Sequence, residues 1–335
     1  MPDVLPLVTL YLSERCNSRC VTCDYWRHGV KDATLDSVQR LLPSLAQLRT
    51  RAVLLSGGEP LLNPEWPAIA ELLKSRGLSL WLLTSGLSLA KHAARAAELF
   101  DSITVSLDGT RASTYLSIRG VDAFDKVCEG IRAIAAAGVP TSVRVTLQRG
   151  NYGELVEFVA LARELGATQV SFLAVDVSNP HAFARRDDAA PELALRAADL
   201  PALDALLGAL ENDHAADFAT RFIAESPAKL RRIRAYFAAL LGLEPFPAVR
   251  CNAPEFSAVV GTDGRVAPCF FIPAAPLAPL APDLAASLAS SPSRTLRAAI
   301  RAGERRECAK CVCSMWRDPE AFAAAGFRLG AAVNA

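Results

Sequence analysis

Three of the nine cysteines in this 335-residue chain stand close together near its start, as Cys16, Cys20 and Cys23 in the spacing C-x3-C-x2-C. Three thiolates on one loop can bind three corners of a four-iron cluster and leave the fourth iron open to a small molecule. A structural zinc site needs a fourth protein ligand nearby, and the next cysteine is Cys128. His28 is the alternative fourth ligand for zinc, which this spacing favours less. The triplet therefore predicts an iron–sulfur cluster with one open iron.

The elements that position these cysteines are short β-branched runs that alternate with helical patterns through the first half. We expect strands at 7–12, 52–55, 78–84, 102–107, 142–148 and 169–174. We expect helices at 35–48, 65–75, 123–137 and 153–165, and an Ala-rich helix that ends near residue 100. Consecutive βα units of this kind require parallel strands with right-handed crossovers, in a doubly wound sheet or a partial TIM-type barrel. Both architectures place functional residues at the carboxyl ends of the strands.

Polar segments end the second, third and fourth of these expected strands or directly follow them. Together they offer an anion for an amine, a cation for a carboxylate and acceptors for ribose hydroxyls, which are the needs of one zwitterionic ligand. Arginine suits a carboxylate because its planar guanidinium can donate two parallel hydrogen bonds. In chain order these residues are Gly57, Gly58, Glu59 and Pro60, then Thr84 and Ser85, then Ser106 and Asp108, and finally Arg119.

The cysteine triplet followed by these segments resembles the radical S-adenosylmethionine (SAM) superfamily over roughly residues 5–175. The resemblance implies a partial (βα)6 TIM-type barrel, a [4Fe-4S] cluster on the triplet and SAM as the second cofactor. It implies that Gly57–Pro60 binds the SAM amino group and that Arg119 binds its carboxylate. Ser106 and Asp108 resemble the ribose-binding pair of the superfamily. Thr84-Ser85 stands where the superfamily usually has Thr-Asn.

One position departs from the superfamily pattern. Members often have an aromatic residue just before the third cysteine, where it contacts adenine, and this chain has Thr22 there. Tyr25 or Trp26 then covers the adenine, or both simply pack as hydrophobic side chains.

The resemblance also implies the chemistry. An electron donor such as a flavodoxin or ferredoxin reduces the cluster, which cleaves SAM to methionine and a 5′-deoxyadenosyl radical. That radical takes a hydrogen atom from a substrate carbon held within van der Waals reach. The step needs no protein acid or base, because the cofactors carry the reaction.

The remaining cysteines gather towards the other end of the chain. Residues 257–269 read as a β-hairpin that brings two cysteines near its ends, and a C-x2-C pair follows. This arrangement resembles the SPASM extension of the superfamily, or its shorter twitch form, and implies an auxiliary [4Fe-4S] cluster. A four-thiolate zinc site is the alternative. The expected ligands are Cys251, Cys269, Cys308 and Cys311; Cys313 is left as a substitute ligand, a catalytic hydrogen-atom donor or an ordinary thiol.

A protein-ligated auxiliary cluster can take an electron from the substrate radical. We therefore expect an oxidoreductase-type enzyme that oxidises a small biosynthetic intermediate, such as a sugar, nucleoside or amino-acid derivative. The first strand begins near residue 7, which leaves no room for the leader-binding domain common in peptide-modifying members. The alternatives are a maturase of a ribosomal precursor peptide, a redox-neutral epimerase with Cys313 as hydrogen donor, and a non-enzymatic zinc-binding interaction module.

Composition restricts the remaining possibilities. A net charge of +1 gives no reason to expect a nucleic-acid or membrane-surface partner. No apolar run is long enough for a transmembrane helix and no signal peptide is evident, so we expect a cytoplasmic protein. We predict a barrel core at 1–176, a helical bridging segment at 177–250 and an auxiliary-cluster domain at 251–335. The basic run at 229–234 indicates either contact with an anionic substrate or a solvated helix face.

Overall fold

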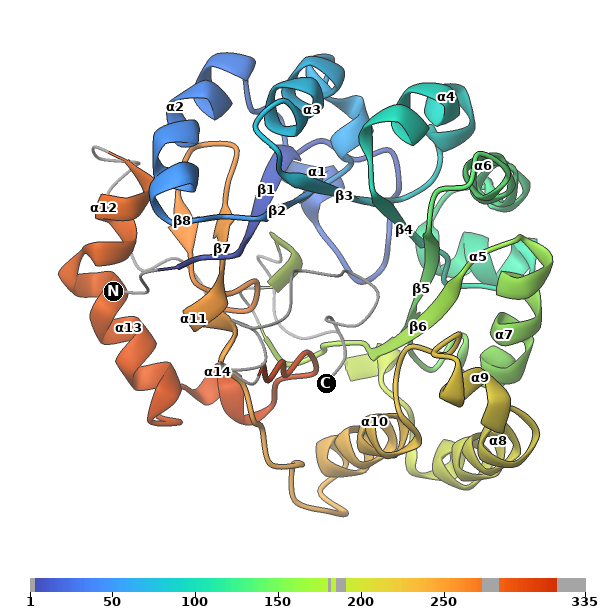
Figure 1. Cartoon of the computed structure of the whole chain (residues 1–335). Coiled ribbons are helices and arrows are strands. Elements are labelled where there is room, and N and C mark those ends of the chain that lie inside the picture. The colour runs from blue at the N-terminus through green and yellow to red at the C-terminus, as the bar shows by residue number, and fades with distance from the viewer. Residues whose placement is uncertain (1–3, 180–181, 185–190, 273–282, 318–335) are drawn as a thin grey trace.

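The computed structural model describes residues 4–179, 182–184, 191–272 and 283–317, apart from the side chains of His28 and Ala184. The zinc alternative that used His28 therefore lies outside the described residues. One eight-stranded sheet with the order β6-β5-β4-β3-β2-β1-β7-β8 curves into an open barrel (Figure 1). The first six strands pair in parallel with their sequence neighbours, which confirms the predicted α/β fold. They are β1 (Leu7–Ser13), β2 (Ala52–Gly57), β3 (Ser79–Thr84), β4 (Ser102–Ser106), β5 (Thr141–Leu147) and β6 (Gln169–Ala174).

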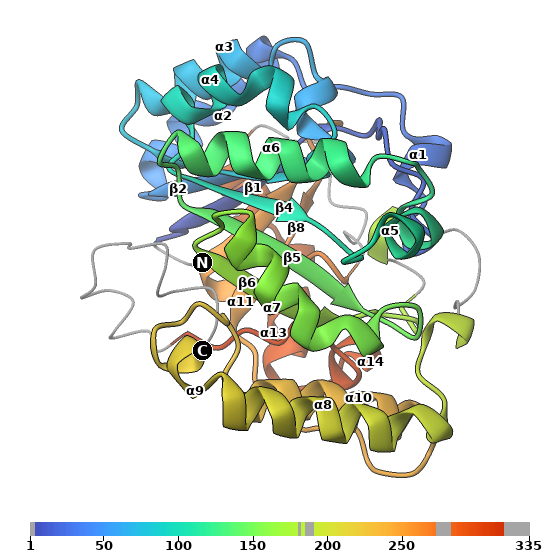
Figure 2. The same ribbon diagram turned by 90° about the vertical axis from the view of Figure 1, so that its right-hand side faces the viewer.

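Helices on the outside of the sheet connect these strands (Figure 2). Each is amphipathic and packs its apolar side on the outer face of the sheet, as the predicted helices require. They are α2 (Leu35–Gln47), α3 (Trp66–Lys74), α4 (Leu89–Leu99), α6 (Phe124–Ala136) and α7 (Leu155–Glu164). Helix α5 (Ala112–Arg119) was not predicted, because its sequence carries only a weak amphipathic pattern.

The two faces of β5 differ in polarity. On β5 the outward-facing Val143 and Val145 are fully buried, whereas Ser142, Arg144 and Thr146 alternate with them on the inner face. The strand register places Arg144 between Ser106 of β4 and Ser171 of β6. Polar side chains therefore line the barrel interior near the ends of these strands.

The segment after β6 is mainly helical, as predicted, with α8 (Leu200–Asp213), α9 (Ala215–Ala219) and α10 (Pro227–Leu240). One detail differs from the prediction that it carries no strand. Val170 of β6 donates to the Phe222 carbonyl and accepts from Ala224, so residues 222–224 pair with the sheet edge in parallel. This short pairing carries no alternating pattern long enough to read from the sequence.

The predicted hairpin is present and becomes part of the barrel sheet. Strand β7 (Ser257–Val260) pairs in parallel with β1, and β8 (Val266–Ala267) is antiparallel to β7. Around it lie α11 (Ala253–Phe256), α12 (Leu284–Ala289), α13 (Ser291–Arg301) and α14 (Arg306–Ala309). The domain boundaries stay predictions. Among the described residues, no helix combines the length and the apolar character needed to cross a membrane.

Candidate functional site

The loop that carries the cysteine triplet joins β1 to the short helix α1 (Tyr25–His28) and is held by α5. Arg19 and Val21 of the loop donate backbone hydrogen bonds to the carbonyls of Arg119 and Ile118, at 2.8 and 3.0 Å. Gly120 ends α5 with φ of +69°, and a Cβ there would lie 2.3 Å from the Arg19 carbonyl oxygen. The unpredicted helix therefore positions the loop, and its terminal glycine permits the close approach.

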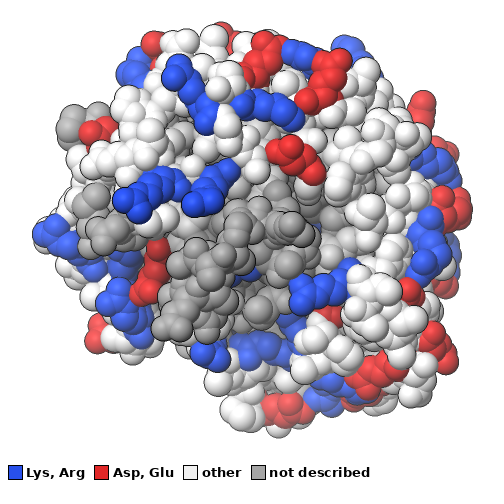
Figure 3. Space-filling view, viewed as in Figure 1, with Lys and Arg blue, Asp and Glu red and all other residues white. Residues whose placement is uncertain are grey.

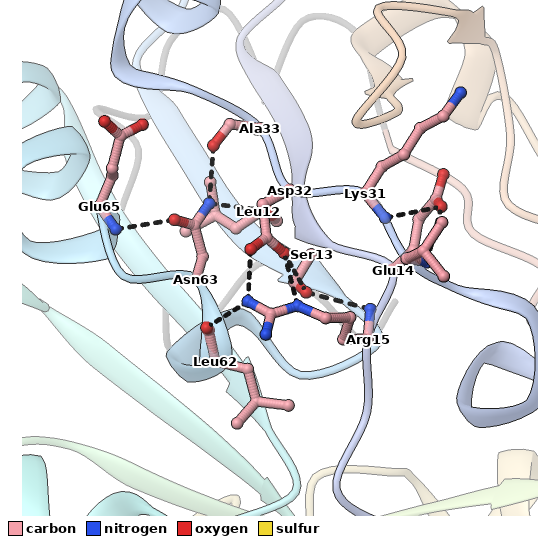
Figure 4. A network of polar contacts seen from close by, with 11 residues as sticks. Leu12, Ser13, Glu14, Arg15, Lys31, Asp32, Ala33, Leu62, Asn63 and Glu65 are labelled. Atoms are coloured by element: carbon pink, nitrogen blue, oxygen red, sulfur yellow. Dashed lines mark hydrogen bonds and ion pairs between the residues drawn. The ribbon is translucent and has the colours of Figure 1, made fainter.

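A polar network supports the start of this loop (Figure 4). Ser13 Oγ donates to the Asp32 carboxylate at 2.6 Å, and Arg15 pairs with the same carboxylate while donating to the Leu62 carbonyl at 2.7 Å. Asn63 Nδ2 donates to the carbonyls of Leu12 and Ala33, at 2.8 Å each. Sequence reasoning missed this network. The network joins Arg15, the residue before Cys16, to the segment that precedes α2 and to the segment that follows β2.

Glu59 lies between the carboxyl ends of β2 and β3 and is fully buried. Its Oε1 accepts from the Leu61 amide at 3.1 Å and from Thr84 Oγ1 at 2.8 Å, and its Oε2 accepts from the Ser85 amide at 2.6 Å. An ionised carboxylate has about four acceptor positions, so room remains for one further donor. Pro60 begins a single 3₁₀ turn, Pro60–Leu62, that orients Glu59. The predicted Glu59, Thr84 and Ser85 thus form one hydrogen-bonded unit.

The two predicted glycines have a packing role in this structure. Gly57 has φ of +124°, and a Cβ there would lie 2.3 Å from the Ser13 carbonyl oxygen. The Gly58 amide donates to Ser13 and the Glu59 amide donates to Arg15, both at 2.7 Å. The end of β2 is thereby joined to the backbone that leads into Cys16.

Asp108 and Arg119 form a buried pair beside the cysteine loop. Arg119 Nη1 donates to Asp108 Oδ2 at 3.1 Å, and the Thr146 amide donates to Asp108 Oδ1 at 2.7 Å. Arg119 Nε is buried without a hydrogen-bond partner among the described residues. Burial alone opposes the charged form, but the nearby Cys20 and Asp108 raise the pKa of Arg119 above its usual value. Ser106, at the end of β4, lies two residues from this pair.

Aromatic rings link the two cysteine regions. The Tyr25 ring lies edge-on to the Tyr11 ring at 5.9 Å, and Tyr11 stacks on Phe270 at 6.5 Å between centroids. Burial is the main reason that the pKa of Tyr25 is raised to about 12. Phe270 directly follows Cys269, so Tyr11 lies between the predicted cluster loop and the auxiliary cysteines.

The three loop thiols are chemically similar. Burial raises the pKa of Cys16 to about 11 and that of Cys23 to about 12, and it also raises the pKa of Cys20. Within the described residues, no three His, Cys, Asp or Glu side chains surround one point as a single metal ion would require. A four-iron cluster does not require the thiols to surround one point, because each thiolate binds its own iron atom.

The auxiliary cysteines meet at one mostly apolar pocket of about 580 Å³, including its open mouth. Burial raises the pKa of Cys269 to about 12 and also raises that of Cys308 and Cys311. The fifth thiol, Cys313, lines the same pocket, so the structure brings together every cysteine after residue 250. The five are Cys251, Cys269, Cys308, Cys311 and Cys313.

Cys313 also lies near three charged residues. Lys229 belongs to the basic run identified in the sequence, whereas Arg144 and Glu225 were not identified there. Burial raises its pKa, while the charges of Arg144 and Lys229 oppose that rise. Glu225, which is buried, accepts from Ser171 Oγ and from the Phe172 amide at 2.8 Å each. The only available signal for Arg144 was its place in the alternation of β5.

Residues 10–162 match the sequence model of the Radical SAM superfamily. An AdoMet-dependent heme synthase of Methanosarcina barkeri is 32% identical over 174 residues, which cover 50% of this chain and 50% of that protein. A probable GTP 3′,8-cyclase of Thermococcus kodakarensis is 31% identical over 164 residues, covering 46% and 52%. The chain thus matches about half the length of these relatives.

Two solved structures share the fold over most of the chain. SuiB of Streptococcus suis, bound to S-adenosylmethionine, superposes with a TM-score of 0.67 at 14% identity, covering 93% of this chain and 73% of SuiB. A structure of anSMEcpe with bound AdoMet gives a TM-score of 0.65 at 16% identity, covering 87% and 79%. At such identities the likeness concerns the fold.

Proposed function

We propose that this chain cleaves SAM reductively and abstracts a hydrogen atom from its substrate, because residues 10–162 match the model of the Radical SAM superfamily, whose members are enzymes. A [4Fe-4S] cluster with bound SAM would supply the electron and the 5′-deoxyadenosyl radical for this chemistry. Cys16, Cys20 and Cys23 would hold the cluster, and a flavodoxin or ferredoxin would be the electron donor. The observation that carries the proposal is the convergence of the cysteine loop with the ends of β2, β3 and β4.

The residues around the loop suit SAM. Glu59 has one acceptor position left for an ammonium group, and Arg119 has a buried Nε that finds no hydrogen-bond partner in the described part of the chain. Asp108 and Ser106 would accept from ribose hydroxyls, and Tyr25 would cover the adenine. An incoming carboxylate would share the Arg119 guanidinium with Asp108, which guanidinium geometry allows because it has five N–H donors.

An auxiliary [4Fe-4S] cluster is the second part of the proposal. Four thiolates are needed, and Cys251, Cys269, Cys308 and Cys311 are the proposed ligands. The common pocket supports a single metal centre for these cysteines. Such a centre would accept an electron from the substrate radical, which makes the net reaction an oxidation. A small-molecule substrate is preferred, because the relatives described above carry names that refer to small molecules.

The test is an anaerobic reconstitution followed by counting iron and sulfide. The intact protein should hold about eight irons, and the variant with Cys16, Cys20 and Cys23 all changed to Ala should hold about four. Only the intact protein should form 5′-deoxyadenosine when a reductant is added. Cys128→Ala is the matched control, because Cys128 is a buried cysteine of α6 outside both groups.

Two results would contradict parts of this proposal. About four irons falling to none, with zinc present, would make the auxiliary site a zinc site and remove the basis for an oxidation. Zinc alone, without iron or SAM binding, would favour the non-enzymatic interaction module.

A redox-neutral reaction is the second candidate, favoured because Cys313 lines the cysteine pocket and also lies within the electrostatic reach of Arg144 of β5. In that case Cys313 would return a hydrogen atom to the substrate radical. Cys313→Ala should then abolish incorporation of solvent hydrogen into product, whereas an oxidising enzyme would keep turning over. A peptide substrate is tested by supplying candidate precursor peptides and measuring 5′-deoxyadenosine formation.

A further inference from the structure

The basic run on α10 separates into two kinds of residue. Arg231 forms an ion pair with Glu211 of α8 at 2.7 Å, and Arg234 pairs with Asp204 of α8 at 3.1 Å and with Glu244. These arginines therefore attach α10 to its neighbours, which is a structural role. The other two members of the run behave differently.

Lys229 and Arg232 lie one helical turn apart on the other side of α10, the side that also carries Ile233. Arg232 donates to the carbonyls of Ala248 and Pro247, at 2.6 and 3.2 Å, which carry no formal charge. Among the described residues, no carboxylate lies within ion-pair distance of Lys229 or Arg232. Within the part of the chain that the structure describes, these positive charges on α10 are therefore not neutralised by an ion pair.

These two side chains line an open pocket between α10, the end of β6 and the C-terminal segment, of about 440 Å³ when its open mouth is included. Lys310 lines it from the opposite side, with its ammonium 5.2 Å from the centroid of the Phe246 ring. The described lining contains three cations and no Asp or Glu. In the view of Figure 3, Lys and Arg side chains also lie below the grey centre of the molecule, in the area that α10 occupies in Figure 1. A pocket with this charge favours an anion.

The pocket adjoins the proposed auxiliary centre. Cys311 lines this pocket and also the pocket of the auxiliary cysteines. The positive charges of Lys229 and Arg144 both lower the pKa of Glu225 and that of Cys313 relative to the effect of burial alone, so these side chains lie near one another. A group bound at Lys229 would therefore lie next to the auxiliary centre.

We propose that the pocket lined by Lys229, Arg232 and Lys310 binds an anionic group, carboxylate or phosphate, of a small-molecule substrate. The assignment of the anion to the substrate rests on the proposed function, whereas the binding itself does not. The pocket would hold the substrate by its charged end while a carbon distant from that end reaches the radical centre. Substrate specificity would then depend on charge at this position.

The test is calorimetric titration of the full, reconstituted chain at constant ionic strength, with SAM at saturation so that its own carboxylate site is filled. Inorganic phosphate and succinate are titrated separately, and the tighter of the two identifies the group. The variant Lys229→Gln/Arg232→Gln should bind the preferred anion at least about tenfold more weakly. The matched control Arg231→Gln/Arg234→Gln removes the same charge from the same helix and should stay within about twofold of the intact protein.

Because either double variant can lose stability, Lys229→Arg and Arg232→Lys are measured as well and should retain binding. Absence of saturable binding in the intact chain, or equal weakening in both double variants, would overturn the proposal. Iron content and SAM cleavage are measured on the same samples. Selective anion binding without SAM cleavage would overturn the proposed function and leave the anion site standing.

Discussion

The Arg119 guanidinium donates to the Asp108 carboxylate at 3.1 Å, with both side chains almost fully buried beside the cysteine loop. A buried charge without a partner is costly, so each of these two charges compensates the other before any ligand arrives. The same two residues are the proposed contacts for the ribose and the carboxylate of SAM. Ligand binding therefore requires a rearrangement or sharing of an existing ion pair.

Arg119→Met should weaken SAM binding by at least about tenfold, because it removes a charge-assisted contact and leaves Asp108 unpaired. Equilibrium binding of SAM to the reconstituted protein measures this. Arg111→Met is the control: Arg111 precedes the same helix and pairs with Glu157 on the surface. Equal affinities for the two variants would contradict the role of Arg119.

Glu59→Gln should lower the free energy of unfolding by about 1–3 kcal/mol even without cofactors. Both Glu59 oxygens accept hydrogen bonds from neighbours. In Gln one of these oxygens is replaced by an NH2 group, which is a donor and would face another donor. Urea denaturation of the apo protein checks this. Glu129→Gln, at an exposed position of α6, should have almost no effect. A similar stability for the two variants would show that Glu59 is not held as described.

Gly57→Ala should reduce the iron bound by the N-terminal site, because the new Cβ would collide with the Ser13 carbonyl oxygen and displace the loop. Gly77→Ala separates this clash from backbone strain. Gly77 also has positive φ, at +75°, but no atom lies within 4 Å of an added Cβ. Iron counts in a background with Cys269, Cys308 and Cys311 removed report the N-terminal site alone. Equal iron loss in both glycine variants would indicate strain, not collision.

The buried loop thiols should react slowly in the folded apo protein. Their pKa values are raised, so the neutral thiol dominates at pH 8 and the reactive thiolate appears only as the pH rises towards about 12 for Cys23. Iodoacetamide labelling of the peptide with Cys20 and Cys23, followed by mass spectrometry, should be at least about tenfold slower than in urea-unfolded protein. The difference should shrink as the pH increases. Equal rates at pH 8 would contradict the raised pKa values.

Cys313→Ala should retain about eight irons, whereas Cys311→Ala should lose about four, if Cys313 is the thiol outside the auxiliary cluster. Iron and sulfide analysis after identical reconstitution makes the comparison. Retention in Cys311→Ala together with loss in Cys313→Ala would exchange the two assignments.

Local patterns were enough to predict much of this protein from its sequence. The alternation of β-branched runs and helices predicted the six parallel strands, with Gln169–Ala174 matching in both bounds, because period and length are properties of each segment. The spacing of Cys16, Cys20 and Cys23, and the polar segments after the strands, predicted the candidate site. Parallel strands bring such segments to one edge of a sheet wherever they occur in the chain.

The tertiary structure decided what depends on contacts between distant residues. The pairing of β7 with β1, the position of all five C-terminal cysteines on one pocket and the bond between Arg119 and Asp108 follow from sheet register and packing. The basic run on α10 is the clearest case. Its four cations look equivalent in the sequence, and only the acids of α8 and Glu244 separate the paired arginines from the pocket-lining Lys229 and Arg232. A charge acquires its role from its neighbours in space, and a local pattern does not contain them.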